Sequence, residues 1–153
     1  MPEVVDVTEL PTLKGKDIGS SRWMTVTQDQ ISTFATLTGD EQWIHVDEER
    51  AKAGPFGSTI AHGFFVLSCS TGFLYELLEV RNAAQIINYG LNRVRFTANT
   101  HVGSRIRMRL KVTDVAEVSG GYQVTFGLTF DREGQEKPVC VAELLFRYYA
   151  PAS

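Results

Sequence analysis

The sequence is poor in several features that mark other classes of protein. No apolar run approaches the roughly 18 residues that a membrane-spanning helix needs, so we expect no membrane partner. The net charge of −3 leaves no basic excess for a nucleic-acid partner. Residues 1–14 lack the basic and apolar regions of a signal peptide, which favours a cytoplasmic protein. No repeat or linker divides the chain, so we expect one domain over residues 1–153.

Cysteine is also scarce. The two cysteines, Cys69 and Cys140, are far apart in the sequence and have apolar neighbours. Buried thiols in a reducing compartment are the simplest interpretation. His45, His62 and His101 have no metal-ligand spacing to one another or to either cysteine, so we expect no metal.

The first half of the chain carries helix signals. Thr27 and Gln30 form a capping-box pattern ahead of apolar residues at helical spacing, and Gly39 ends that pattern. Asp47 is a candidate cap for a short helix from Glu48 to Ala53. We therefore expect two helices separated by a polar loop.

A strongly apolar segment follows, and the pattern then changes. From His62 to about Val80 the chain is apolar nearly all round, which predicts one long buried helix. After it, apolar and polar residues alternate over about 84–96, 105–112, 122–130 and 139–149, which predicts antiparallel strands. The expected fold class is α+β, with a long central helix wrapped by a curved antiparallel sheet of five or six strands.

Asp40 and His45 are the first candidate site residues. They lie five positions apart, just after the first predicted helix. Asp is common in turns, so a polar loop with a surface histidine is the plain alternative. If the two side chains converge on one water, however, a carboxylate and an imidazole can share proton transfer near neutral pH.

His62 and Gly63 are the second candidate, at the start of the apolar helix. Here a packing glycine beside a satisfied histidine is as good an interpretation as a functional one. In the functional interpretation, glycine allows close approach of a substrate. The first amides of the helix, which have no intrahelical acceptor, would then stabilise an enolate or oxyanion.

Other polar residues have plainer explanations. Hydroxyls such as Ser68 and Thr71 usually bond back to a helix carbonyl. The alternating basic residues of 105–111 fit a solvated outer sheet face, with phosphate recognition as the alternative. Trp43 and Phe56 are better suited to packing than to stacking on a base.

Two segments of the first half follow a known family pattern, at Phe34, Leu37, Thr38-Gly39-Asp40, Ile44-His45, Asp47, Ala51, Phe56-Gly57 and Ile60-Ala61-His62-Gly63. Together they resemble the MaoC-like dehydratase family, whose members include (R)-specific enoyl-CoA hydratases. The resemblance covers residues 34–68 and extends by its strand pattern over most of the chain. Within it, Gln42-Trp43 and the 88–96 stretch are most similar to the nodulation-protein-N-like branch.

The resemblance implies a hot dog fold and a homodimer with its sites near the subunit interface. It implies catalytic roles for Asp40 and His45, an oxyanion amide at Gly63 and a substrate-binding hydroxyl at Thr71. The family's Asn-Pro is replaced by Gln42-Trp43, and we expect the large Trp43 ring to line or narrow the acyl pocket.

The implied reaction is reversible hydration of trans-2-enoyl-CoA to (R)-3-hydroxyacyl-CoA, with CoA as part of the substrate and no other cofactor. An acyl-CoA thioesterase of the same fold is one alternative, because such enzymes also place a carboxylate near a helix start. A non-catalytic acyl-binding subunit of a hydratase complex is another, although it has no need for both Asp40 and His45.

Overall fold

The second half of the chain forms the sheet that its alternating pattern predicts. In the computed structural model, which describes residues 1–153, β6 (Arg105–Val118) pairs antiparallel with β7 (Gly121–Arg132), and β7 with β8 (Cys140–Tyr149). β5 (Gln85–Arg95) pairs antiparallel with β8 and forms one edge. Gly120, in the turn between β6 and β7, has a φ of 83°, which glycine adopts without steric cost.

The other edge of the sheet comes from the N-terminal part of the chain. β2 (Asp17–Ser20) and β3 (Met24–Thr25) both pair with β6, which gives six strands in the order β2-β6-β7-β8-β5, with β3 beside β6. β1 (Glu3–Asp6) pairs in parallel with β4 (Leu78–Arg81) as a separate ribbon. A 3₁₀ helix, η1 (Val7–Leu13), follows β1.

The helices of the first half form where their caps predict. α1 (Gln28–Thr38) has both hydrogen bonds of the Thr27 capping box, and Gly39 ends it in the left-handed conformation. α3 (Glu48–Lys52) is capped by the Asp47 side chain and ends one residue before the predicted end. A further short helix, α2 (Trp43–Val46), lies between them. It has no side-chain cap, so no local sequence pattern predicted it.

The central helix is not continuous, which corrects the prediction of one helix from His62 to Val80. α4 (Gly63–Ser68) and α5 (Ser70–Leu77) are separated at Cys69, and residues 78–80 belong to β4. The Ser68 hydroxyl and the Cys69 thiol both bond back to carbonyls four residues earlier, a pattern that bends helices. After Leu77 the pairing with β1 takes over from helical hydrogen bonding.

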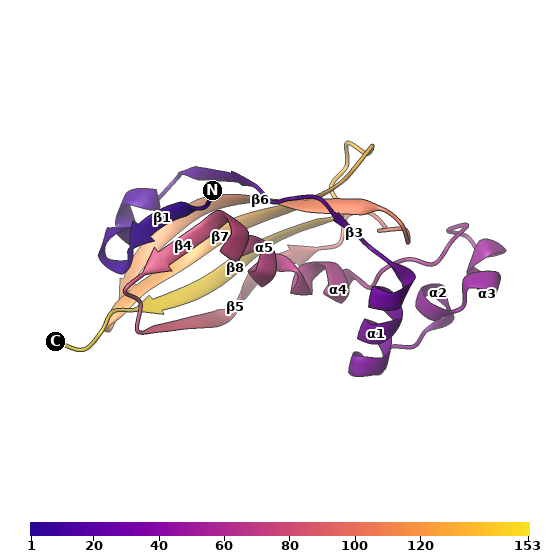
Figure 1. The fold of residues 1–153 in the computed structure, drawn as a ribbon, viewed down its shortest axis with the longest axis horizontal. Coiled ribbons are helices and arrows are strands. Elements are labelled where there is room, and N and C mark those ends of the chain that lie inside the picture. Colours follow the sequence, from indigo (N-terminus) through magenta and orange to yellow (C-terminus); the bar gives the residue numbers. More distant parts are fainter.

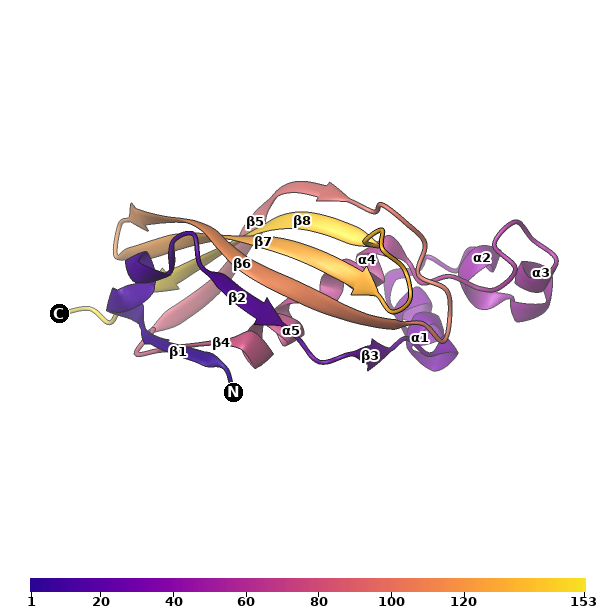
Figure 2. The same cartoon turned by 90° about the horizontal axis from the view of Figure 1, so that it is seen from above.

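α4 and α5 lie against one face of the curved sheet, as Figures 1 and 2 show from two directions. Alternate β6 side chains from Ile106 to Val112 point into the shared core and are almost fully buried. The helices are not buried all round, because Phe64 is 68% exposed and Tyr75 is 55% exposed. No helix of the chain has both the length and the apolar character that crossing a membrane requires.

α1, α2 and α3 lie beyond one end of the sheet, close to the start of α4 (Figure 1). The chain passes from α3 back to α4 through residues 53–62, and Ile60 forms an isolated bridge with His101 on the way. This return brings the polar loop after α1 and the start of the central helix into one place.

Candidate active site

Three segments meet at the start of α4. Asp40 lies in the loop after α1, His45 lies in α2, and His62 is the residue before Gly63, where α4 begins. The backbone N–H of Ile60 donates to the carbonyl of Ile44 over 3.0 Å, which ties α2 to the strand-like segment that leads into α4. The fold therefore brings Asp40, His45 and Gly63 into one region, as the sequence predicted.

The Asp40 carboxylate and the His45 ring face one another. Oδ2 of Asp40 lies 3.9 Å from Nε2 of His45. The Asp40 side chain is 53% exposed, whereas that of His45 is 8% exposed. A water to one side of the line between these atoms can bond to both, because each hydrogen bond needs only about 2.8 Å.

The hydrogen bonds of His45 fix which of its nitrogens carries the proton. Nδ1 lies 2.7 Å from the carbonyl oxygen of Ile60, and a carbonyl only accepts, so Nδ1–H is the donor. Nε2 then keeps its lone pair and directs it toward Asp40. Burial lowers the pKa of His45, so the ring is neutral at pH 7 and able to accept a proton.

His62 belongs to the same cluster, a fact that its sequence left undecided. Its ring stacks on that of His45, with centroids 3.8 Å apart and planes 24° from parallel. Nε2 of His62 lies 2.9 Å from the backbone carbonyl oxygen of Asp40 and 4.0 Å from Oδ2 of the same residue. The one sequence feature that pointed to His62 is the His-Gly pair at a predicted helix start.

The proximity of Asp40, His45 and His62 corrects one premise of the sequence argument against a metal. Their ligand atoms lie within 4.8 Å of one another, although their spacing matches no metal motif. Two of the four imidazole nitrogens are nevertheless occupied as donors to the carbonyls of Ile60 and Asp40. Lone pairs of stacked rings also lie in nearly parallel planes and do not meet at one tetrahedral ion, so the set does not fit a zinc site.

Gly63 lies beside a small cavity at the same place. Its N–H is the first of α4 and has no acceptor in the chain. The cavity has a volume of about 130 Å³, and its walls include His45, Gly63 and Phe96. The Phe96 ring covers the α-carbon of Gly63 so closely that a Cβ there would lie 2.6 Å from it. Only glycine fits beneath this ring.

Trp43 and Thr71 are not brought into the cavity. The Trp43 ring packs under the guanidinium of Arg50, 4.3 Å from the ring centre, and against Gly54. Thr71 lies in α5, beyond the break at Cys69, and does not line the cavity. The structure therefore offers no contact through which Trp43 would narrow an acyl pocket in this chain.

A glutamine missed by the sequence argument supports His45. The Gln28 side chain donates to the His45 carbonyl over 2.8 Å and accepts from the Thr59 hydroxyl over 2.5 Å. This amide ties α1 to α2 and to the segment before α4. Its partners are distant in sequence, so no local pattern could have identified it.

The basic row on β6 is paired with acidic residues of the neighbouring chain segment. Arg109 lies 2.9 Å from Asp131, and Arg105 lies 2.9 Å from Glu133. Arg107 also faces Asp131 and covers the ring of Trp23. The outer-face interpretation fits these contacts better than phosphate recognition does, because the three arginines of the row already have acidic partners.

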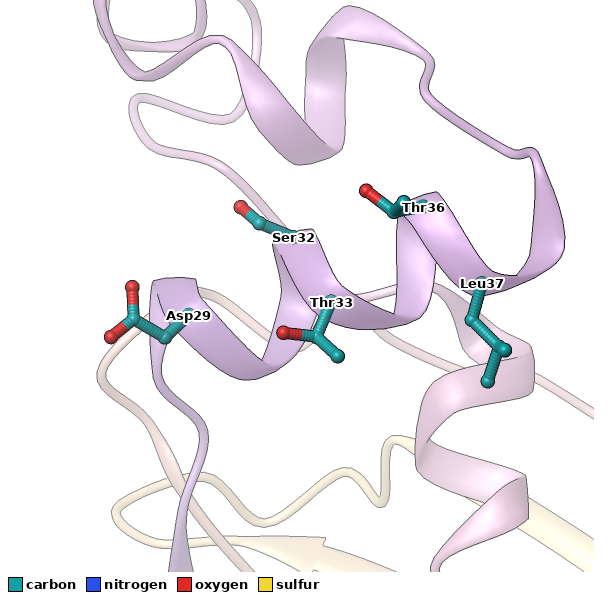
Figure 3. Close-up of a pocket in the computed structure, with 5 residues that line it drawn as sticks. All are labelled: Asp29, Ser32, Thr33, Thr36 and Leu37. Carbon is teal, nitrogen blue, oxygen red and sulfur yellow. The ribbon is translucent and has the colours of Figure 1, made fainter.

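A separate hollow lies along the outer face of α1 (Figure 3). It has a volume of about 680 Å³, and all five residues that line it come from this one helix. Asp29 is its only ionisable group, and Leu37 projects at the far end of the row. No imidazole lines this hollow, so Asp40, His45 and His62 are the better candidates for acid–base chemistry.

Comparison with known proteins places the chain in a family. A family model described as "MaoC like domain" matches residues 9–132. The chain is 46% identical over 145 residues to 3-hydroxyacyl-thioester dehydratase Z of Mycobacterium tuberculosis, a match that covers 94% of this chain and 96% of that protein. It is 36% identical over 141 residues to nodulation protein N of Rhizobium leguminosarum, covering 90% and 88% respectively. These relatives confirm the resemblance to the family and to its nodulation-protein-N-like branch.

A solved structure confirms the hot dog fold. The R-hydratase PhaJ1 from Pseudomonas aeruginosa superposes with a TM-score of 0.76 over 95% of this chain and 86% of its own, at 19% identity. At that identity the match establishes the architecture alone. Together with the family model and the relatives, it leads to one conclusion: the chain belongs to the MaoC-like dehydratase family and is an enzyme of the hydratase and dehydratase type.

Proposed function

We propose that this enzyme catalyses the reversible hydration of a trans-2-enoyl thioester to the (R)-3-hydroxyacyl thioester, with CoA as the carrier. The observation that carries the proposal is that the Asp40 carboxylate lies 3.9 Å from the His45 ring, and that His45 lines one small cavity together with Gly63, whose N–H is free. The name of the 46% identical relative supports a thioester substrate, and the names of R-hydratases with the same fold support the (R) product. CoA enters with the substrate, and the chemistry needs no further cofactor.

The geometry suggests a role for each group. Asp40 and His45 hold one water, and a water proton passes to Nε2 of His45 as the oxygen bonds to C3. C2 takes up a proton from the same acid–base pair, so all atoms of the water are added to the double bond. Meanwhile the thioester oxygen gains negative charge and accepts from the Gly63 N–H. An oxyanion donor of this kind is typically worth about 3 kcal/mol of the barrier.

The cavity of one chain is too small for the whole substrate. Its volume of about 130 Å³ falls below the roughly 300–1,000 Å³ of typical ligand pockets. We propose a homodimer in which a second copy pairs with the free edge of β5, near Phe96, and so extends the cavity walls. The exposed apolar side chains of this edge include Ile87, Tyr89 and Leu91. A cytoplasmic location stays part of this proposal.

The decisive experiment is hydration of crotonyl-CoA and longer trans-2-enoyl-CoA substrates, followed by loss of enoyl absorbance. The product is resolved on a chiral column, and free thiol is measured in the same reaction. The proposal requires enoyl loss, an (R) product and no thiol release.

Other outcomes would favour a rival function. Thiol release without hydration indicates the thioesterase. Calorimetric binding of acyl-CoA without any turnover indicates an acyl-binding subunit. An S product, or failure to bind or turn over any acyl-CoA of the series, overturns the proposal as stated.

A further inference from the structure

His62 is the more deeply buried imidazole of the site, yet the proposed chemistry gives it no role. It is 3% exposed and lies at the N-cap position of α4, where it makes no cap hydrogen bond to the helix. Its ring is held between the His45 ring, 3.8 Å away, and the Phe34 ring, 5.0 Å away. Phe65 in turn packs edge-on against Phe34. A buried imidazole that serves packing alone would gain nothing from its polar atoms.

The polar atoms of His62 serve a specific contact. Nε2 lies 2.9 Å from the backbone carbonyl of Asp40, so Nε2–H is the donor and Nδ1 is the unprotonated nitrogen. Nδ1 is buried and has no hydrogen-bond partner in the chain. Leaving a buried polar atom unpaired is unfavourable, which indicates that the ring is retained for the Nε2 contact and for its stacking on His45.

That contact holds a loop with little other support. Gly39 leaves α1 in the left-handed conformation, and Gln42 enters α2 without a side-chain cap bond. Between them, the Asp40 carbonyl is tied to α4 only through His62. The Asp40 side chain, 53% exposed, has no close hydrogen-bond partner of its own. Its position relative to His45 therefore depends on where its backbone is held.

We propose that His62 is a positioning residue that sets the acid–base pair, by anchoring the Asp40 backbone through Nε2–H and supporting the His45 ring from beneath. The inference rests on the proposed hydration function. His62 does not contact the reacting atoms and passes on no proton. It places the Asp40 carboxylate and the His45 lone pair at the separation that one shared water can bridge, a distance to which rate is sensitive.

Two substitutions separate the parts of this role. His62→Gln can keep an N–H donor close to the place of Nε2 but removes the ring, whereas His62→Phe keeps a stacked ring but removes the donor. We expect His62→Phe to lower kcat by about ten- to a hundredfold, with KM within about twofold. We expect His62→Gln to recover kcat to within about threefold of the wild type. Equal losses in both variants, or none in His62→Phe, overturn the anchoring role.

The pH dependence of kcat/KM gives a second test, because a purely structural role for His62 would not change it. The titratable groups that face His62 are His45 from α2 and Asp40 from the preceding loop, and the Phe34 ring of α1 also lies against it. Burial is the largest cause that lowers the pKa of His45, and the neighbouring His62 imidazole lowers it further. In His62→Gln the acid limb of kcat/KM should therefore move to higher pH. His101→Gln, which removes an imidazole bonded to Ser58 instead, is the matched control and should leave the limb in place.

A measurement without turnover keeps this inference separate from the proposed function. Nitrogen-15 correlation spectra of the imidazoles in the wild-type protein should show His62 as the Nε2–H tautomer and His45 as the Nδ1–H tautomer. An Nδ1–H tautomer at His62 overturns the inference even if hydration is observed. If the tautomers are as expected and the wild type hydrates no enoyl-CoA, the proposed function fails while the contact itself stands.

Discussion

Asp40 and His45 face one another across 3.9 Å but differ sharply in their surroundings. The carboxylate is half exposed to solvent, whereas the imidazole is buried and has its second nitrogen bonded to the Ile60 carbonyl. Burial lowers the pKa of His45, which keeps its Nε2 lone pair available at neutral pH. Of the two groups, His45 is therefore suited to accept the proton of a water, and Asp40 is suited to orient that water.

The first prediction tests this division of work. Asp40→Asn and His45→Gln should each lower kcat for crotonyl-CoA hydration by about a hundredfold or more, because each removes a proton-transfer or water-orienting group. Binding of a non-reactive acyl-CoA, measured by calorimetry, should change much less. Glu41→Gln is the matched control, since Glu41 is the adjacent carboxylate and makes only a long contact with Thr36. Full activity in either site variant would refute the assignment.

The second prediction concerns the close packing of Gly63 and Phe96. In Gly63→Ala the new Cβ would lie 2.6 Å from the Phe96 ring, so either the ring or the start of α4 has to move. A moved helix start misplaces the oxyanion donor, and we expect kcat to fall by about tenfold or more.

The double variant Gly63→Ala/Phe96→Ala distinguishes these causes. Removal of the ring frees the space that the Cβ needs, so Gly63→Ala should cost less activity in the Phe96→Ala background than in the wild type. Additive effects in this double-mutant cycle would show that the contact does not govern the amide position.

Local chemistry in the sequence predicts the ends of α1 and α3 and the period of the long strands. Thr27, Gly39 and Asp47 act within a few residues of the chain, and so their effect is visible without a structure. The break at Cys69 and the end of the helix at Leu77 are different. They depend on side-chain bonds back to the helix and on pairing between β1 and β4, which no apolar pattern encodes.

In the candidate site, too, some residues could be predicted from local sequence, whereas others depend on contacts between distant segments. Sequence context and the family resemblance indicated Asp40, His45 and Gly63, and in the fold His45 lies close to both Asp40 and the Gly63 cavity. His62 and Gln28 act through contacts with distant backbone carbonyls, so their importance appears only in three dimensions. The size of Trp43 suggested that it lines a pocket. Its ring instead packs against Arg50 and Gly54, which lie close to it in the sequence.

The third prediction concerns how the free energy of unfolding depends on pH. Burial lowers the pKa of both His45 and His101 in the folded state. The unfolded state titrates near the ordinary histidine value of about 6.5 and then binds more protons than the folded state. The free energy of unfolding should therefore be highest above about pH 6.5 and should decrease as the pH falls below that value.

Measuring Tm from neutral to mildly acidic pH tests whether stability decreases as the pH falls. His45→Gln and His101→Gln should each flatten the fall in Tm, because each removes one group that resists protonation in the fold. Asp6 and Asp114 do not contribute in this range, because hydrogen bonds to Asn82 and Lys14 lower their pKa values further from neutrality. A Tm that rises as the pH falls would contradict the prediction.

The last prediction tests the proposed dimer through the edge of the sheet. β5 is eleven residues long and pairs on one side with β8, and its other side offers unpaired N–H and C=O groups. At the opposite edge, β2 and β3 are four and two residues long, so β5 is the edge better suited to pairing with a second copy. Multi-angle light scattering should show a dimer for the wild type at micromolar concentration.

Charged residues on this edge should then separate the copies. Ile87→Lys and Leu91→Lys place an ammonium group at apolar positions that are 37% and 42% exposed in one chain, and both should shift the protein toward monomer. Val4→Lys is the matched control, because Val4 is 41% exposed on β1, outside the main sheet. If the partner completes the cavity beside Phe96, the monomeric variants should also lose turnover of long acyl chains before that of crotonyl-CoA. A wild type that is monomeric and fully active would exclude a site built at the subunit interface.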